Sequence, residues 1–147
     1  MLKESLLDIF ERDLNKLKEE ISLYPDETKL WVIDKEISNS AGNLCLHLIG
    51  NLNYFIGAGL GNTGYVRERD KEFSLKNIPQ KDLIDSVEKT KKVVIETLQQ
   101  LSEVDFEKEY PEGKWREKAT TGYLLILFST HLSYHLGQIN YHRRLLQ

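Results

Sequence analysis

The chain has 147 residues, of which 40% are hydrophobic and 29% are charged, and its net charge is −3 at pH 7. This length suits one domain with a hydrophobic core of its own, and the composition is that of an ordinary globular protein. Acidic and basic residues are mixed along the chain, which argues against a nucleic-acid-binding surface, because such a surface needs a basic patch.

The sequence favours a cytoplasmic protein that does not enter a membrane. No apolar run approaches the roughly 20 residues that a transmembrane helix needs. The N-terminal stretch mixes apolar and charged residues and lacks the apolar centre of a signal peptide. Cys45 is the single cysteine, so it cannot form an internal disulfide, as is usual in a reducing compartment. We expect Cys45 to be a small core residue rather than a nucleophile.

The first predicted helix runs from Leu2 to Leu23. Its apolar residues recur at steps of three and four with charged residues between them, which is typical of an amphipathic helix. They are Leu6, Ile9, Phe10, Leu14, Leu17 and Ile21. Tyr24 should end the helix, because a residue that precedes proline avoids helical dihedral angles. In the connector over residues 25–39, we expect Trp31 to cover one end of the core.

A second helix is predicted from Ser40 to Gly57, with one of the polar residues 38–40 as its N-cap. We expect Gly57, Gly59 and Gly61 to end it. Its buried face should hold Leu44, His47, Leu48, Asn51, Leu52, Phe55 and Ile56.

The connector from Leu60 to Pro79 is longer than the roughly two to eight residues usual between the helices of a bundle. It is long enough to return along the bundle, so the third helix, from Gln80 to Leu101, should run parallel to the second. The fourth helix begins at Thr120 or Thr121 and continues to Leu146. Its stretch from Tyr123 to Phe128 is apolar on nearly every side and should be the most buried. Four helical patterns without a strand pattern predict a single all-α domain, a four-helix bundle with a long crossover.

Two histidines, His131 and His135, lie four residues apart in the fourth helical pattern. This spacing places both imidazoles on one face, one turn apart, where they can grip one divalent metal ion. His47 is the only other histidine in the middle of a predicted buried face. A single histidine in an apolar run is more often a packed core residue. A buried imidazole needs partners at both nitrogens, however, so the three together favour a metal site.

The fourth histidine, His142, is expected to be solvated and not to bind the metal. It lies seven residues after His135, about 10 Å further along the helix axis. It is followed by Arg143 and Arg144, which belong to a solvated helix end.

Three imidazoles suit zinc, nickel, copper or iron(II), and we expect zinc or nickel. On zinc they leave one of the four positions open for water or substrate. A closed structural zinc site is disfavoured because the chain has no Cys-x-x-Cys motif. A zincin-type protease is disfavoured because Leu132 stands where that motif has glutamate.

Three polar neighbours are candidates for lining the pocket of such a site: Asn51, Gln138 and Tyr134. Each amide is equally compatible with a buried hydrogen bond to a neighbouring helix, and the tyrosine with simple packing. Aspartate and glutamate are absent from residues 41–67 and 119–147. A general base must therefore come from another element, or the metal-bound group must itself be the nucleophile, and no catalytic residue is assigned.

Three segments resemble the DinB-like metal-binding four-helix bundle superfamily, and within it a small bacterial group of unknown function. They are HLIGNLNYF (47–55), TGYVRERDKEF (63–73) and STHLSYHLGQINYHRRLL (129–146). The resemblance covers nearly the whole chain and implies an up-down-down-up bundle, a divalent metal on His47, His131 and His135, and frequent homodimers. It implies no DNA binding. Characterised relatives include metal-dependent transferases and isomerases that use thiols such as bacillithiol or mycothiol, but no thiol-binding residue can be matched here.

Two classes of function follow. The first is a metal-dependent enzyme that acts on a small molecule, with transfer of a low-molecular-weight thiol favoured over hydrolysis. The second is a non-catalytic metal-binding or interaction bundle, in which the metal holds helices together. Apolar residues of the long connector, Leu60, Tyr65 and Phe73, also suggest a homodimer, because a monomer would leave them exposed.

Overall fold

The chain is mainly helical in the computed structural model, which describes residues 1–111 and 113–146. Four long helices form its body: α1 (Leu2–Ser22), α2 (Ala41–Leu52), α5 (Gln80–Gln100) and α7 (Thr121–Leu145). The shorter elements are the 3-10 helix η1 (Glu27–Trp31), the π-helical segment η2 (Asn53–Ala58), α3 (Gly59–Gly61), α4 (Arg69–Ser74) and α6 (Glu103–Glu107). Within the described residues the chain forms no strand, and an isolated bridge joins Glu109 to Thr120. The all-α prediction is therefore confirmed.

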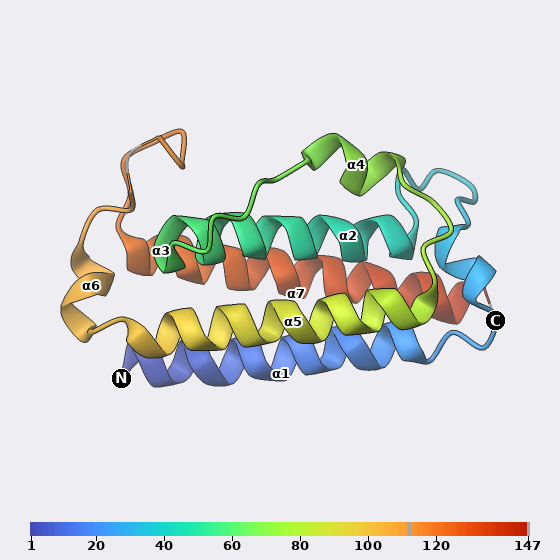
Figure 1. Cartoon of the computed structure of the whole chain (residues 1–147). Helices are drawn as coiled ribbons and strands as arrows, with labels where there is room; N and C mark the ends of the chain where they lie inside the picture. The colour runs from blue at the N-terminus through green and yellow to red at the C-terminus, as the bar shows by residue number, and fades with distance from the viewer. Residues whose placement is uncertain (112, 147) are drawn as a thin grey trace.

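The four long helices lie side by side in two layers (Figure 1). Helix α1 packs against α5 and α7, while α2 packs against α7 and α5. In the figure, α1 and α7 run from left to right, and α2 and α5 run from right to left. The connector between α2 and α5 crosses the outer side of α2, where its short helix α4 packs.

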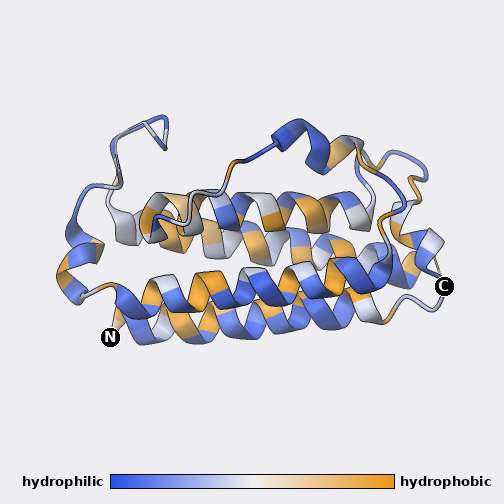
Figure 2. Ribbon diagram, in the orientation of Figure 1, coloured by the Kyte–Doolittle hydropathy of each residue, from blue (hydrophilic) through white to orange (hydrophobic). Residues whose placement is uncertain are grey.

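Apolar residues at helical spacing form the core of this arrangement. Hydrophobic and hydrophilic residues alternate along α1 and α5 (Figure 2), and the buried hydrophobic side chains come from all four long helices. From α1 and α5 the buried set includes Leu6, Phe10, Leu14, Leu17, Ile21, Leu83, Val87, Val94 and Leu98. Full burial of one such side chain contributes about 1.5–3 kcal/mol, so these stripes are a main source of the free energy that holds the helices together.

Hydroxyl side chains begin the two helices that carry the histidines. Ser40 accepts a hydrogen bond from the backbone N–H of Asn43, and Thr120 accepts one from that of Tyr123, both at 3.2 Å. These N-caps satisfy backbone donors that the first turn leaves free. The predicted starts of both helices are confirmed.

The second helical segment continues beyond its predicted end. Gly57, Gly59 and Gly61 are helical, and the C-cap is Asn62, whose φ is +51°. A Cβ atom on Gly59 would stand 2.2 Å from the hydroxyl oxygen of Tyr110. The predicted end at Gly57 was therefore too early, although the helical segment does end within the glycine cluster, at Gly61. At Gly59 the missing side chain lets Tyr110 approach the helix backbone.

The apolar half of α7 is less buried than predicted. Tyr123 and Ile126 are exposed, so the stretch is not enclosed on every side. Leu124, Leu125 and Phe128 are buried and face the core. Together with Tyr134 and Tyr141 further along, the exposed pair shows that α7 keeps an outward face.

One segment, Ala41–Gly61, is long and apolar enough to cross a membrane by length and composition alone. The prediction that no apolar run approaches such a length was therefore too strict. Half of the tested window is buried inside the protein, and a core helix passes the same test. The segment is weak evidence for a membrane span, since its buried face carries polar His47 and Asn51.

Candidate metal centre

Three histidines from two helices meet inside the bundle. His47 lies on α2, and His131 and His135 lie one turn apart on α7. The Nε2 atom of His131 is 3.1 Å from Nε2 of His47 and 3.1 Å from Nε2 of His135. One ring nitrogen of each residue lies within 4.8 Å of the others, and His47 is buried while the other two are partly buried. The structure thus brings together the three residues that the sequence grouped.

Burial keeps the α7 imidazoles neutral at neutral pH. It lowers the pKa of His131 to about 4, with smaller contributions from His135, His47 and Arg67. Burial also lowers the pKa of His135, against a hydrogen bond to Gln138 that raises it. A neutral imidazole has a free lone pair and is the form that binds a metal ion.

The spacing of the three nitrogens suits a divalent metal ion. Two zinc–nitrogen bonds of about 2.0–2.1 Å at a tetrahedral angle place their nitrogens about 3.3 Å apart. The two observed distances between Nε2 atoms are 3.1 Å. The donors are three imidazoles, which bind zinc, nickel, copper and iron(II). The residues present therefore fit the metal ion that the sequence predicts.

Hydrogen bonds at the outer nitrogens orient two of the rings. The Glu72 carboxylate accepts from Nδ1 of His47 at 3.0 Å, and the amide oxygen of Gln138 accepts from Nδ1 of His135 at 2.7 Å. A neutral imidazole that donates through Nδ1 keeps its lone pair on Nε2. Both rings are therefore held in the tautomer that offers Nε2 as a ligand atom.

The carboxylate of Glu72 was not identified from the sequence. It comes from α4 on the crossover, and Arg67 holds it through two hydrogen bonds of 2.9 Å. Burial acts to raise the pKa of Glu72, but the hydrogen bonds from His47 and Arg67 outweigh it, so that pKa is lowered. The absence of acidic residues from both histidine helices was the available signal, since it required any carboxylate to come from another element.

Two buried polar atoms beside the cluster have no hydrogen-bond partner among the described residues. They are Nδ1 of His131 and the amide oxygen of Asn51. The Asn51 side chain lies one turn beyond His47 on α2, as predicted, and it is buried. A buried polar atom normally has a hydrogen-bond partner, which an ordered water can supply.

A cavity of about 610 Å³ opens beside the cluster. Its wall includes His135, Gln138 and Tyr134, together with apolar side chains such as Ile37 and Leu145. Two of the three predicted pocket residues line this cavity, and Asn51 does not. A cavity of this size accommodates a small organic molecule.

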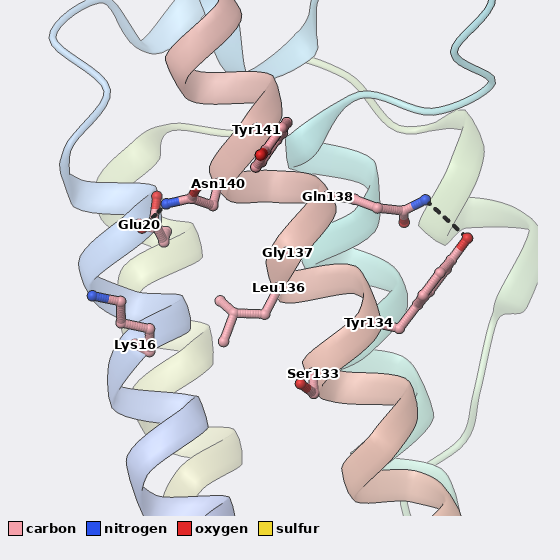
Figure 3. A pocket seen from close by; sticks show the side chains of 9 residues that line it. All are labelled: Lys16, Glu20, Ser133, Tyr134, Leu136, Gly137, Gln138, Asn140 and Tyr141. Carbon is pink, nitrogen blue, oxygen red and sulfur yellow. Dashed lines mark hydrogen bonds between the residues drawn. The ribbon is translucent and has the colours of Figure 1, made fainter.

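A second, more open groove of about 670 Å³ lies between α1 and α7 (Figure 3). Lys16 and Glu20 line it from α1, and Tyr134 and Gln138 line it from α7. The Gln138 amide donates a hydrogen bond of 3.3 Å to the Tyr134 hydroxyl. The same two side chains also line the cavity beside His135.

His142 is buried, so the prediction that it is solvated was wrong. Its side chain is bonded on both sides, by the Tyr24 hydroxyl at 2.6 Å from Nδ1 and by the Val32 carbonyl oxygen at 2.8 Å from Nε2. Arg143, whose charge suggested a solvated end, forms an ion pair with Glu20 at 2.8 Å. His142 ties the end of α7 to the first connector and lies outside the three-histidine group, as expected.

The sequence matches a protein family over nearly its whole length. The family described as "Protein of unknown function (DUF1572)" matches residues 4–147, so the chain belongs to it. No curated protein matches the chain. The family description names no activity, and a functional assignment must therefore come from the site itself.

Proposed function

We propose that this DUF1572 protein binds one divalent metal ion through Nε2 of His47, His131 and His135 and acts as an enzyme on a small molecule. The observation that carries the proposal is the convergence of these three side chains, whose ligand nitrogens lie within 4.8 Å of one another. Zinc or nickel suits this donor set best. We also propose that the chain is a DinB-like bundle in up-down-down-up order, which the helix directions in Figure 1 support.

An open coordination position supports an enzyme over a purely structural site. Among the described residues, no fourth histidine, cysteine, aspartate or glutamate belongs to the group. Two polar side chains at the cluster, Glu72 and Gln138, are hydrogen-bonded to the outer nitrogens of His47 and His135. A bound metal ion supplies Lewis acidity, which favours loss of the proton from a thiol or water that occupies the remaining position.

The side chains around the centre favour a thiol over water as the reactant. Both oxygens of Glu72 already accept hydrogen bonds from Arg67 or His47, so this carboxylate is poorly placed to act as a general base. Cys45 is fully buried, and burial raises the pKa of its thiol to about 12, so the thiol is not supplied by the chain. A small thiol from solution has a pKa of about 8.5, against about 15.7 for water, so it loses its proton more readily and depends less on a general base. The cavity beside His135 is where the electrophile would lie.

The reaction we propose forms a bond between the thiol sulfur and a carbon of the electrophile. The bond from that carbon to its leaving group breaks, the leaving group departs with the electron pair, and the thiol proton passes to solvent. The test supplies metal-loaded protein with bacillithiol, mycothiol or glutathione and a halogenated aromatic compound. We expect thioether formation faster than with the His131→Ala variant. Thioether formation no faster with wild type than with His131→Ala, for each of the three thiols, would contradict thiol transfer.

A non-catalytic role is the second candidate, because the three ligands join α2 to α7 and a metal ion there would act as a cross-link between them. The two roles differ in whether a ligand from solution can bind to the metal ion. A site that only cross-links helices should not respond to added thiol, whereas an open position should change the absorption spectrum of the cobalt(II)-loaded protein when thiol binds.

A homodimer in the cytoplasm remains part of the proposal, although one motive for it is weaker. The ring centroids of Phe73 and His47 lie 4.9 Å apart, and Leu60 packs against the core, so neither side chain is fully exposed to solvent. Tyr134, Tyr141 and Leu145 are exposed along α7 and offer a different apolar surface. Light scattering that gives the monomer mass of 17.1 kDa at micromolar concentration would rule the dimer out.

A further inference from the structure

A single carboxylate from the crossover meets the one histidine that α2 contributes to the cluster. We propose that Glu72 is a positioning residue, which fixes the tautomer and ring orientation of His47 for metal binding. We further propose that position 50 requires glycine because any side chain there would occupy the space of the Glu72 carboxylate. The proposal rests on the proposed metal site and adds to it a dependence on the crossover.

The contacts of Glu72 use both of its oxygens. Oε1 accepts from Nδ1 of His47 at 3.0 Å and from Nη2 of Arg67 at 2.9 Å, and Oε2 accepts from Nε of Arg67 at 2.9 Å. Glu72 is 6% exposed. A carboxylate buried to this extent is stable only when it is paired and hydrogen-bonded, and here Arg67 supplies the charge that permits its burial.

The path of the carboxylate to His47 passes over Gly50. A Cβ atom on Gly50 would stand 1.9 Å from Oε2 of Glu72 and 2.5 Å from its carboxyl carbon. Any side chain at position 50 would therefore push the carboxylate away. Because glycine weakens a helix interior, a glycine that meets a buried side chain this closely points to a need for the space.

The same face of α2 also anchors the backbone of α4. The buried Asn43 amide donates to the carbonyl oxygens of Glu72 and Leu75, both at 2.9 Å. Asn43, His47 and Gly50 follow one another at steps of four and three residues, so they share one face of the helix. The docking of α4 on α2 thus fixes the position of Glu72 along α2 and the direction from which its carboxylate approaches His47.

This geometry makes one metal ligand depend on the crossover. A carboxylate that accepts from Nδ1–H holds the ring and makes the opposite nitrogen a stronger ligand, and loss of such a partner costs about 10–100-fold in metal affinity. His135 has the Gln138 amide in the same position, which is neutral. His47 is therefore the ligand whose hydrogen-bond acceptor carries a negative charge. By linkage, metal binding should in turn stabilise the docked crossover.

The test compares two disruptive variants with two matched controls. Glu72→Gln removes the charge, and Gly50→Ala displaces the carboxylate without changing it. Glu68→Gln alters an exposed glutamate of the same connector, which pairs with Lys71 alone among the described residues. Gly137→Ala alters a helical glycine with no atom within 4 Å of an added Cβ. Circular dichroism of the metal-free proteins first checks that each one folds.

The readouts are the zinc dissociation constant, by competition with a chromophoric chelator, and proton NMR of the cobalt(II)-loaded protein. We expect affinity to fall about 10–100-fold in Glu72→Gln and Gly50→Ala and to stay at the wild-type value in both controls. In both disruptive variants the exchangeable Nδ1–H signal of His47 should shift and exchange faster with water, while the signals of His131 and His135 remain. A purely structural loss would move all three signals together.

Two results would overturn the positioning role of Glu72, and only the second would also overturn the metal site. If wild type binds zinc and folded Glu72→Gln binds it equally well with an unchanged His47 signal, the positioning role is wrong and the metal site stands. If wild type and both controls bind no zinc, the metal site itself is wrong, and the positioning role falls with it.

Discussion

The amide oxygen of Gln138 lies 2.7 Å from Nδ1 of His135, three residues earlier on α7. The amide nitrogen of Gln138 donates to the Tyr134 hydroxyl at 3.3 Å, which turns the oxygen toward the imidazole. Gln138 therefore holds His135 in the tautomer that offers Nε2 to a metal ion.

Replacing Gln138 with alanine should weaken metal binding by about 10–100-fold, because His135 loses the acceptor that orients it. The zinc dissociation constant, measured by chelator competition, reports the change. Gln100→Ala, at an exposed position at the end of α5, is the control and should bind zinc as wild type does. Equal affinities for the two variants would show that Gln138 does not support the ligand.

His142 should matter for stability and not for metal binding. Its Nε2 donates to the Val32 carbonyl oxygen, and its Nδ1 accepts from the Tyr24 hydroxyl. Replacement by leucine leaves the buried Tyr24 hydroxyl without this acceptor and the partly buried Val32 carbonyl without this donor, and we expect a loss of about 1–3 kcal/mol in the free energy of unfolding. Urea denaturation measures that loss. Metal content should remain one ion per chain, and a variant without metal would place His142 among the ligands.

The Glu20–Arg143 ion pair should stabilise the contact between α1 and α7. Glu20 is 2% exposed and accepts from Arg143 at 2.8 Å and from Asn140 at 2.7 Å. Removing one partner of a buried pair leaves the other uncompensated, so Glu20→Ala should cost about 3 kcal/mol. The exposed Glu11→Ala variant should change the free energy of unfolding by less than about 0.5 kcal/mol.

The contribution of this ion pair should depend on pH in one direction. Burial acts to raise the pKa of Glu20, but bonds from Arg143 and Asn140 outweigh it and lower that pKa below its ordinary 4.5. The unfolded chain therefore takes up the proton first as pH falls. The stability difference between wild type and Glu20→Gln should be constant above pH 4.5 and shrink below it. A difference that grows on acidification would contradict this assignment.

Helical periodicity located the long helices and the histidines. Phe10 and Leu14 of α1 are buried as their spacing predicts, and His131 and His135 share a face for the same reason. Within one helix, sequence spacing fixes which side chains lie together. His47 could be added because it is a polar residue in the middle of an apolar stripe.

Residues of the crossover could not be located in this way. Helical periodicity predicts which residues of one helix share a face, but it does not predict which residues of the crossover pack on that face. The position of Glu72 and Arg67 beside His47 is therefore seen only in the folded chain. His142 was misplaced because the charge of Arg143 suggested solvent, whereas that charge is paired with Glu20. The role of a residue in a long connector depends on tertiary contacts that local sequence does not encode.

Removal of the metal should lower the melting temperature without unfolding the chain. The apolar stripes of all four long helices are buried independently of the histidines, unlike the core of a zinc finger. Free metal at about 1,000 times its dissociation constant adds about 4 kcal/mol, which raises the melting temperature by roughly 10 °C. Circular dichroism with and without chelator measures both effects, and loss of the helical signal on chelation would contradict the expectation.

Metal content tests the three-histidine site most directly. The protein is purified without a metal-affinity tag, incubated with zinc and freed of unbound ions. Its zinc content is then measured by inductively coupled plasma mass spectrometry. We predict one ion per chain for wild type, one for His142→Leu, and close to none for His131→Ala. Full retention of zinc by His131→Ala would contradict the assignment of His47, His131 and His135 as the ligands.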